Sequence, residues 1–236
     1  MENQAFKIFR RFGLDVRRAR RHPTLNDFLA HRNIQVVYDV GANVGQFGMK
    51  IRQRGYRGKI ISFEPVKSVF EELKRAAGPD ANWEVVHCAV GAKPGETTIH
   101  VSRNTQFSSI KPLAERSSAI DPDSSFASSE TVEVKTLDEL VRRNGGAYFI
   151  KVDTQGFERE VLDGGKTAVA GAAGVLLELP VINTYDDTWT FHEAVGHMRD
   201  LGLVLCQIDP VGHHEADPMA TIDFDCLFRH KASGVD

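Results

Sequence analysis

The stretch VVYDVGANVGQF, residues 36–47, places Asp39 in an apolar run that ends in a glycine-containing turn. A carboxylate in such a run must be paired or solvated, because burying it alone is costly. Gly41 permits a sharp turn, and Gly45 lets a following helix begin close to a sheet. The free N–H groups at the start of a helix attract an anionic group. The stretch therefore predicts a strand, turn and helix that bind a ligand.

The spacing of this turn favours one class of cofactor over another. Asn43 stands where the dinucleotide fingerprint GxGxxG has the glycine that lets the backbone approach a pyrophosphate. A ligand with a carboxylate and an ammonium group needs less clearance and gives a reason for a nearby acid. Glu64, 23 residues after Gly41, ends the next apolar run, where an acid can accept both hydroxyls of an unmodified ribose. We therefore expect S-adenosylmethionine rather than NAD, with contacts from Asp39, Gly41, Asn43, Val44, Gly45, Glu64 and Pro65.

Two further acids end later apolar runs, Asp153 in FIKVDTQG and Glu178 in LLELP. The carboxyl ends of the strands in an open α/β sheet face the same crevice. A hydroxyl acceptor of the sulfonium's methyl group would have to lose its proton, which would call for a base. The apolar neighbours of Glu178 predict a raised pKa for its carboxyl group. Asp153 and Glu178 are therefore the catalytic candidates.

Each catalytic candidate has an alternative role. Asp153 is as well suited to holding the ammonium group of the cofactor as to acting as a base. Glu178 is nearly as well suited to pairing with a buried cation such as Lys151. His192, at the start of a predicted helix, ranks third, because a helix histidine is more often solvated.

The elements that must position these residues alternate along the chain. Seven apolar, strand-like runs are separated by segments of helical period, which predicts parallel β-α-β units in a doubly wound sheet. The predicted strands are 36–42, 59–64, 83–90, 147–153, 174–179, 203–208 and 223–229, and the helices are 5–16, 66–77, 137–143, 157–162 and 191–201.

Residues 91–131 interrupt this alternation. They contain a predicted strand at 97–101, and then a Ser-, Pro- and Asp-rich tract that is too polar for the core. We expect an insertion that is either a mobile lid or a disordered loop. The predicted organisation is a basic helical extension at 1–30 and one cofactor-binding domain at 31–236.

Several motifs together resemble the FkbM family of class I S-adenosylmethionine-dependent methyltransferases. They are VVYDVGANVGQF, ISFEP, HCAVG, NTQFSSI, FIKVDTQGFEREVLDGG and DFDCLF. The resemblance implies a Rossmann-like, seven-stranded sheet with its last strand antiparallel, and O-methylation of sugars, glycolipids or polyketide-type small molecules. Family members often read DxEG where this chain has Gln155, which can form hydrogen bonds but cannot take a proton.

The acceptor and adenine contacts are less marked in the sequence. The family pattern indicates acceptor contacts at Asn104, Ser108, Ser109, Gln155 and Tyr185, with Trp189 able to stack on a sugar. Backbone groups near Ala89 and Val90 are the candidates for holding adenine. No metal is expected, although His213 and His214 lie near two acids.

Composition excludes some classes and leaves one alternative. The 236 residues are 42% apolar and 26% charged, the three cysteines form no disulfide pattern, and no run approaches the ~20 apolar residues of a membrane span. A cytoplasmic address follows by default. Residues 1–22 carry +5, which leaves −8 for the rest of the chain. The rival hypothesis is a membrane- or nucleic-acid-associated binding protein with a degenerate site. We expect no nucleic-acid partner. Peripheral membrane contact through residues 1–22 stays open.

Overall fold

The computed structural model describes residues 23–114, 125–141, 146–211, 213–214 and 217–231. The predicted helix at 5–16 lies outside these residues, as do the basic segment 1–22 and the end of the helix predicted at 137–143. Residues 23–30 of the predicted extension are described, and they contain most of helix α2, Leu25–His31. A reciprocal capping box between Thr24 and Asp27 closes the first turn of this helix.

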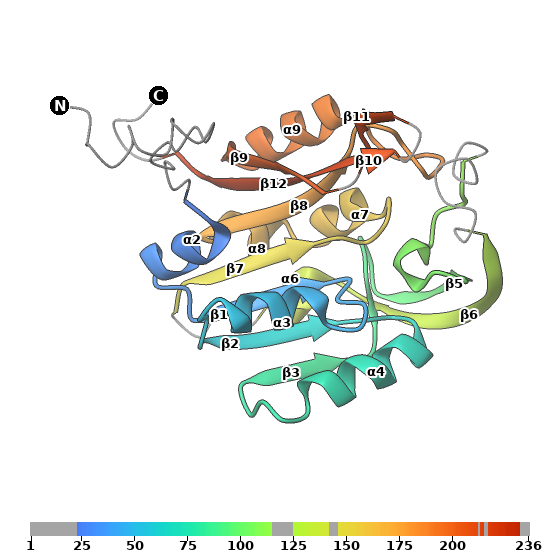
Figure 1. Ribbon diagram of the computed structural model, residues 1–236, viewed down its shortest axis with the longest axis horizontal. Coiled ribbons are helices and arrows are strands. Elements are labelled where there is room, and N and C mark those ends of the chain that lie inside the picture. The colour runs from blue at the N-terminus through green and yellow to red at the C-terminus, as the bar shows by residue number, and fades with distance from the viewer. Residues whose placement is uncertain (1–22, 115–124, 142–145, 212, 215–216, 232–236) are drawn as a thin grey trace, which may run out of the picture.

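The centre of the fold is a seven-stranded sheet with the order β3-β2-β1-β7-β8-β12-β9 (Figure 1). Strands β3, β2, β1, β7 and β8 are parallel, and β12 runs antiparallel to both β8 and β9. The predicted mostly parallel sheet with an antiparallel last strand is thereby confirmed. The strands are β1 Val36–Val40, β2 Lys59–Phe63, β3 Trp83–Val86, β7 Tyr148–Val152, β8 Gly174–Pro180, β9 Leu203–Pro210 and β12 Asp223–His230.

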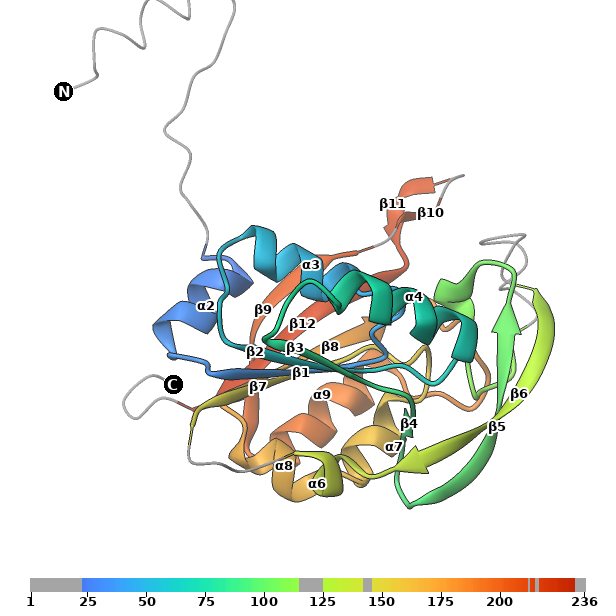
Figure 2. The ribbon, with the colours of Figure 1, turned by 90° about the horizontal axis from the view of Figure 1, so that it is seen from below.

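Helices cover both faces of this sheet, as Figure 2 shows. Helices α2, α3 and α4 lie on one face, and α6, α7, α8 and α9 lie on the other. Their bounds are α3 Gln46–Gln53, α4 Lys67–Ala77, α6 Leu137–Leu140, α7 Glu158–Asp163, α8 Lys166–Gly171 and α9 Phe191–Asp200. None of the helices in the described ranges is long and apolar enough to cross a membrane.

The continuous apolar character of the central strands follows from this double cover. On β1, Val37 belongs to the core under α2 and α3, whereas Tyr38 and Val40 belong to the larger core on the other face. A parallel strand that is buried on both faces carries apolar residues at successive positions rather than at alternate ones. Asp39 therefore stands out on β1 because every neighbouring side chain is in a core.

The insertion contains a second, three-stranded sheet with the order β4-β6-β5, which corrects two expectations. The predicted strand 83–90 is divided between β3 in the main sheet and β4, Ala89–Val90, in the small one. Residues 126–131, predicted to be lid or loop, belong to β6, Phe126–Lys135, which pairs antiparallel with β5, Gly95–Ser102. β6 buries Val132 and Val134, and its serines and glutamates are more exposed, so a polar sequence still forms a strand.

The remaining elements extend from these two sheets. A single turn of 3-10 helix, η1, Thr105–Phe107, follows β5. The strands β10, His213–His214, and β11, Asp217–Thr221, form a two-stranded ribbon between β9 and β12.

Candidate active site

The turn after β1 is shaped by a close approach of two backbones. Gly41 has a φ of +74°, and a Cβ atom at this position would lie 1.8 Å from the carbonyl oxygen of Asp153. Gly45 has a φ of +93° and forms the N-cap of α3. Asn43 between them also has a positive φ, +48°, which asparagine tolerates better than most residues. The glycine requirement predicted at 41 thus has a specific cause, the proximity of β7.

Glu64 lies at the carboxyl end of β2 and is joined to the same turn. Its carboxylate accepts hydrogen bonds from the backbone N–H of Asn43, at 2.9 Å, and of Val66, at 2.9 Å. Only 5% of the residue is exposed. Burial raises the pKa of Glu64 to about 7, against the lowering effect of the two hydrogen bonds. The cavity described below reaches this carboxylate.

Glu64→Gln is expected to change how stability depends on pH. Because the folded-state pKa of about 7 lies above the ordinary 4.5, ionising Glu64 destabilises the fold as pH rises through that interval. The unfolding free energy of the unchanged protein should fall from pH 4.5 to 7, and it should fall less for the variant, by up to about 3 kcal/mol. Urea titrations at several pH values measure this difference. The same dependence of the unfolding free energy on pH in the two proteins would contradict the prediction.

Asp39 lies beneath the turn and is fully buried. Its carboxylate accepts a 3.0 Å hydrogen bond from Ser62 Oγ and lies 3.5 Å from Lys151 Nζ. Burial raises the pKa of Asp39, and Lys151 opposes that effect. Asp39 does not line the cavity, so the geometry gives it the task of holding Lys151 beneath the turn. Direct contact between Asp39 and a cofactor stays a prediction.

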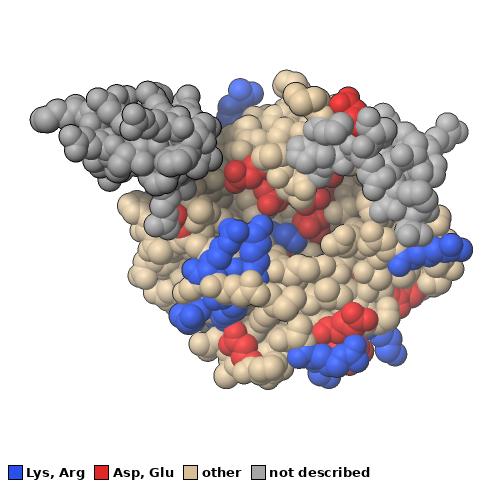
Figure 3. All heavy atoms as spheres, in the orientation of Figure 1, with Lys and Arg blue, Asp and Glu red and all other residues tan. Residues whose placement is uncertain are grey.

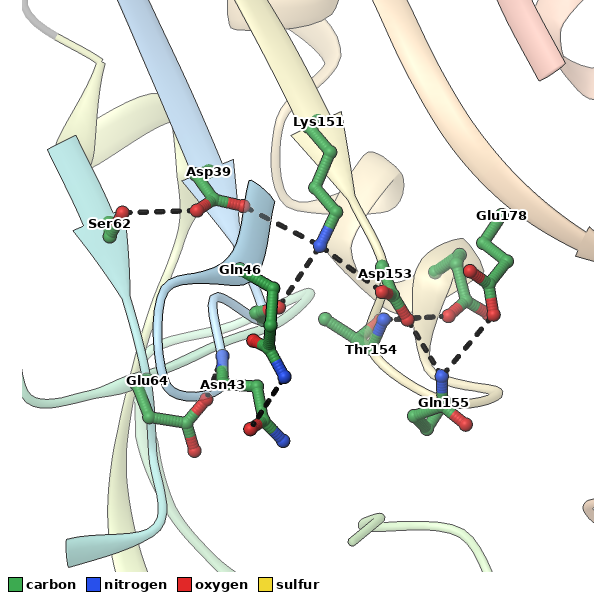
Figure 4. A network of polar contacts seen from close by, with 12 residues as sticks. Asp39, Asn43, Gln46, Ser62, Glu64, Lys151, Asp153, Thr154, Gln155 and Glu178 are labelled. Atoms are coloured by element: carbon green, nitrogen blue, oxygen red, sulfur yellow. Dashed lines mark hydrogen bonds and ion pairs between the residues drawn. The ribbon is translucent and has the colours of Figure 1, made fainter. Parts of the chain in front are cut away.

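Lys151 connects the two acids on either side of the turn (Figure 4). Its Nζ donates to Asp153 Oδ2 at 3.1 Å and to the carbonyl oxygen of Gly41 at 3.1 Å. Burial alone lowers the pKa of Lys151, but Asp153, Asp39 and Glu178 outweigh it, so the pKa lies above its ordinary value. Sequence reasoning considered Lys151 only as a partner for Glu178. In the sequence, the usable signal is a lysine inside an apolar strand, two residues before Asp153. In the structure, Lys151 lies between Asp39 and Asp153.

Asp153 and Glu178 come together through Gln155. The side-chain nitrogen of Gln155 donates to Asp153 Oδ1 at 2.7 Å and to Glu178 Oε1 at 3.5 Å (Figure 4). Burial raises the pKa of Glu178 well above its ordinary value, and the charges of Asp153 and Asp223 add to this effect. The raised pKa that its apolar neighbours predicted thus has burial as its main cause and acidic neighbours as a second one.

The predicted acceptor residues are arranged around this pair of acids. Ser108 and Gln155 both line the cavity. Ser109 Oγ donates to the carbonyl oxygen of Gln155 at 2.6 Å, and Tyr185 Oη donates to Gln155 Oε1 at 2.9 Å. Asn104 caps η1 by accepting a hydrogen bond from the backbone N–H of Gln106. Ser109, Tyr185 and Asn104 therefore support the wall rather than form it.

Two aromatic or basic candidates lie elsewhere. Trp189 is only 5% exposed and belongs to the main core, so it is not placed to stack on a sugar. His192 lies exposed on α9 and is absent from the cavity wall.

A cavity of about 380 Å³ lies between the carboxyl edge of the main sheet and the insertion. Such a volume is within the range of small-molecule sites. Of the sequence-predicted residues, its wall contains Gly41, Asn43, Glu64, Pro65, Ala89, Val90, Ser108, Asp153, Gln155 and Glu178, whereas Val44 and Gly45 of the turn are not part of it. Figure 3 shows acidic and basic side chains near one another in the middle of this face.

Sequence reasoning missed two carboxylates of the wall, Asp223 and Asp225 on β12. Asp225 is directly opposite Glu178 in the pairing of β12 with β8. Burial raises the pKa of Asp223 to about 7, and Asp153 and Glu158 act in the same direction. The alternating acids of DFDC were a usable sequence signal for two acids on one face of a strand. That this face lies next to Glu178 depends on the insertion of β12 beside β8.

Comparisons with known proteins agree with this architecture. A sequence model described as the methyltransferase FkbM domain matches residues 39–205. The structure of methyltransferase FkbM from Methylobacillus flagellatus KT is similar, with a TM-score of 0.51, 15% identity and coverage of 84% of this chain and 44% of that one. TehB from Haemophilus influenzae has a TM-score of 0.50, 9% identity and coverage of 95% and 66%. This chain therefore spans less than half of the first structure and 66% of the second. No curated protein matches the sequence.

Proposed function

The chain belongs to the FkbM family of methyltransferases, and from this membership we propose that it is an S-adenosylmethionine-dependent O-methyltransferase. The proposed acceptor is a hydroxyl group of a sugar, a glycolipid or a polyketide-type small molecule. The observation that carries the proposal is the arrangement around β1: Gly41 leaves room for the backbone of Asp153, and the carboxylates of Glu64 and Asp153 lie on the wall of one cavity.

The residues of the turn fit such a cofactor. Glu64 presents a buried carboxylate to the cavity, suited to accepting ribose hydroxyls. Asp153, with 24% of its side chain exposed, offers a carboxylate for an ammonium group. Ala89 and Val90 line the cavity from β4, in a position suited to adenine. When bound, S-adenosylmethionine supplies a methyl group on a sulfonium, which is already activated for transfer to oxygen.

The acceptor side of the cavity is suited to removing a hydroxyl proton. We assign the proton to the carboxylate of Glu178, whose raised pKa makes it a stronger base than an exposed glutamate. Asp223 and Asp225 lie on the same wall, and among its described residues only Lys50 and Lys151 are basic. Lys151 is already bonded to Asp153 and Gly41. This charge distribution favours a neutral polyhydroxyl acceptor over an anionic one.

Calorimetric titration with S-adenosylmethionine and with NAD tests the cofactor. We expect S-adenosylmethionine to bind, and Glu64→Gln to weaken that binding about tenfold by removing a charged acceptor. Binding of NAD alone would overturn the assignment. Mass spectrometry of candidate sugar and lipid-linked acceptors, with isotope-labelled cofactor, then tests for the gain of one methyl group.

A further inference from the structure

Both polar atoms of the Gln155 side chain form hydrogen bonds inside the protein. Its nitrogen donates to Asp153 Oδ1 at 2.7 Å and to Glu178 Oε1 at 3.5 Å, which engages both of its N–H groups. Its Oε1 accepts from Tyr185 Oη at 2.9 Å, and its backbone oxygen accepts from Ser109 Oγ at 2.6 Å. The residue holds a left-handed backbone conformation, with a φ of +54°, despite having a side chain.

The orientation of this amide follows from its surroundings. Burial raises the pKa of Tyr185, so its phenol stays protonated and has an O–H to donate. The nearer acceptor for that O–H is Gln155 Oε1, at 2.9 Å, and the carbonyl oxygen of Phe107 lies further away, at 3.3 Å. The reverse orientation would turn the amide oxygen, an acceptor, toward Asp153 Oδ1 and Glu178 Oε1, which are acceptors too. The N–H groups of Gln155 therefore face Asp153 and Glu178.

Glu178 depends on this amide more than Asp153 does. Asp153 also accepts a hydrogen bond from Lys151, at 3.1 Å. Among the described residues, Gln155 is the one side chain that hydrogen-bonds to the Glu178 carboxylate. Without that contact, Glu178 would be a half-buried acid beside further acids, and no other described side chain would donate a hydrogen bond to hold its orientation.

We propose that Gln155 is a positioning residue: the two N–H groups of its amide hold the carboxylates of Asp153 and Glu178 toward one point of the cavity wall. The catalytic meaning of this inference rests on the proposed function, in which Glu178 takes the proton of the acceptor hydroxyl. Gln155 itself takes no proton and needs no contact with the substrate. It links the acids instead to Tyr185 and, through its backbone, to Ser109 of the insertion.

The ionisation of Glu178 reports directly on this contact. Donated hydrogen bonds favour the charged carboxylate, and nearby negative charges disfavour it. The charged groups that act on Glu178 are Lys151 on β7, Asp153 directly after β7, and Asp223 and Asp225 on β12. Glu178 in turn acts on Tyr185, and Glu158 of α7 acts on Asp223 and Tyr185. None of these groups is itself substituted when Gln155 alone is replaced.

Carbon-13 NMR of protein labelled at the glutamate side-chain carboxyls tests the proposal without any cofactor. The signal of Glu178 is identified by its loss in Glu178→Gln. Gln155→Met keeps the length of the side chain and removes its hydrogen bonds, so the Glu178 midpoint should move to higher pH by about one unit. Gln155→Glu keeps the shape and adds a charge, so the midpoint should move further in the same direction.

The outcomes separate this inference from the proposed function. An unchanged or lowered Glu178 midpoint in both variants overturns the positioning role, whether or not the protein transfers methyl groups. A raised midpoint supports it, even if no acceptor is ever methylated.

If Gln155→Met does not fold, Tyr185→Phe keeps Gln155 and removes the hydrogen bond to its side-chain oxygen, and the Glu178 midpoint should then move up by a smaller amount. For an active enzyme, the acid limb of the pH–rate profile should move with the NMR midpoint; a merely structural defect would lower the rate without moving that limb.

Discussion

Gly41→Ala is expected to destabilise the protein and to abolish binding of S-adenosylmethionine. The added Cβ atom would lie 1.8 Å from the carbonyl oxygen of Asp153, so the turn after β1 and the end of β7 must separate. A positive φ, +74° here, costs an alanine about 1–2 kcal/mol, and forcing two packed backbones apart adds roughly 1–3 kcal/mol. Urea unfolding measures the stability, and calorimetry measures the binding.

Gly55→Ala is the matched control for this prediction. Gly55 also has a positive φ, +100°, but nothing lies within 4 Å of the place where its Cβ atom would be. The control therefore carries the backbone strain without the collision, and it should lose about 1–2 kcal/mol while still binding the cofactor. If the two variants lose the same stability and bind equally well, the close approach to Asp153 is not what requires glycine at 41.

Glu178→Gln is expected to lower kcat by about 10²–10⁴-fold while the affinity for the cofactor changes little. The amide fills the same space but cannot accept the proton of the acceptor hydroxyl. Since burial raises the pKa of Glu178 above its ordinary 4.5, the rate of the unchanged enzyme should rise with pH through a midpoint above that value. The variant should lack this rise. Steady-state kinetics across pH, with calorimetry on both proteins, measures both effects.

Stability separates this loss of activity from misfolding. A raised folded-state pKa means that ionising Glu178 destabilises the fold as pH rises through that pKa. Glutamine cannot ionise, so the variant should be at least as stable as the unchanged protein above the midpoint. A variant that is both inactive and less stable there would not support a catalytic role for Glu178.

Asp153→Asn addresses the alternative that the sequence left open between the two acids. If Asp153 holds the ammonium group of the cofactor, its replacement should weaken cofactor binding, whereas Glu178→Gln should not. The opposite pattern would exchange the two assignments. Gln155 donates hydrogen bonds to both acids, so the same two variants also show whether its contact with Asp153 or its contact with Glu178 contributes more to activity.

The sequence by itself determined which strand ends carry the acidic residues of the site. Asp39, Glu64, Asp153 and Glu178 all come at or near the ends of apolar runs, and parallel strands bring such ends to one edge. The need for glycine at 41 was also readable, because a turn directly after a buried strand leaves little room for a side chain. These features depend on local periodicity and on a general rule of α/β folds, so they need no knowledge of distant contacts.

The tertiary structure alone decided how these residues divide their tasks. Asp39 is at the centre of the sequence motif, yet it lies below the cavity, because Lys151 from a strand 112 residues further along the chain pairs with it. Asp223 and Asp225 reach the wall because β12 inserts between β8 and β9, next to Glu178. Residues 126–131 at the end of the serine-rich tract form part of β6 because the partner strand β5 pairs with their backbone groups. Pairings of this kind join residues far apart in the chain, and no local pattern of side chains specifies them.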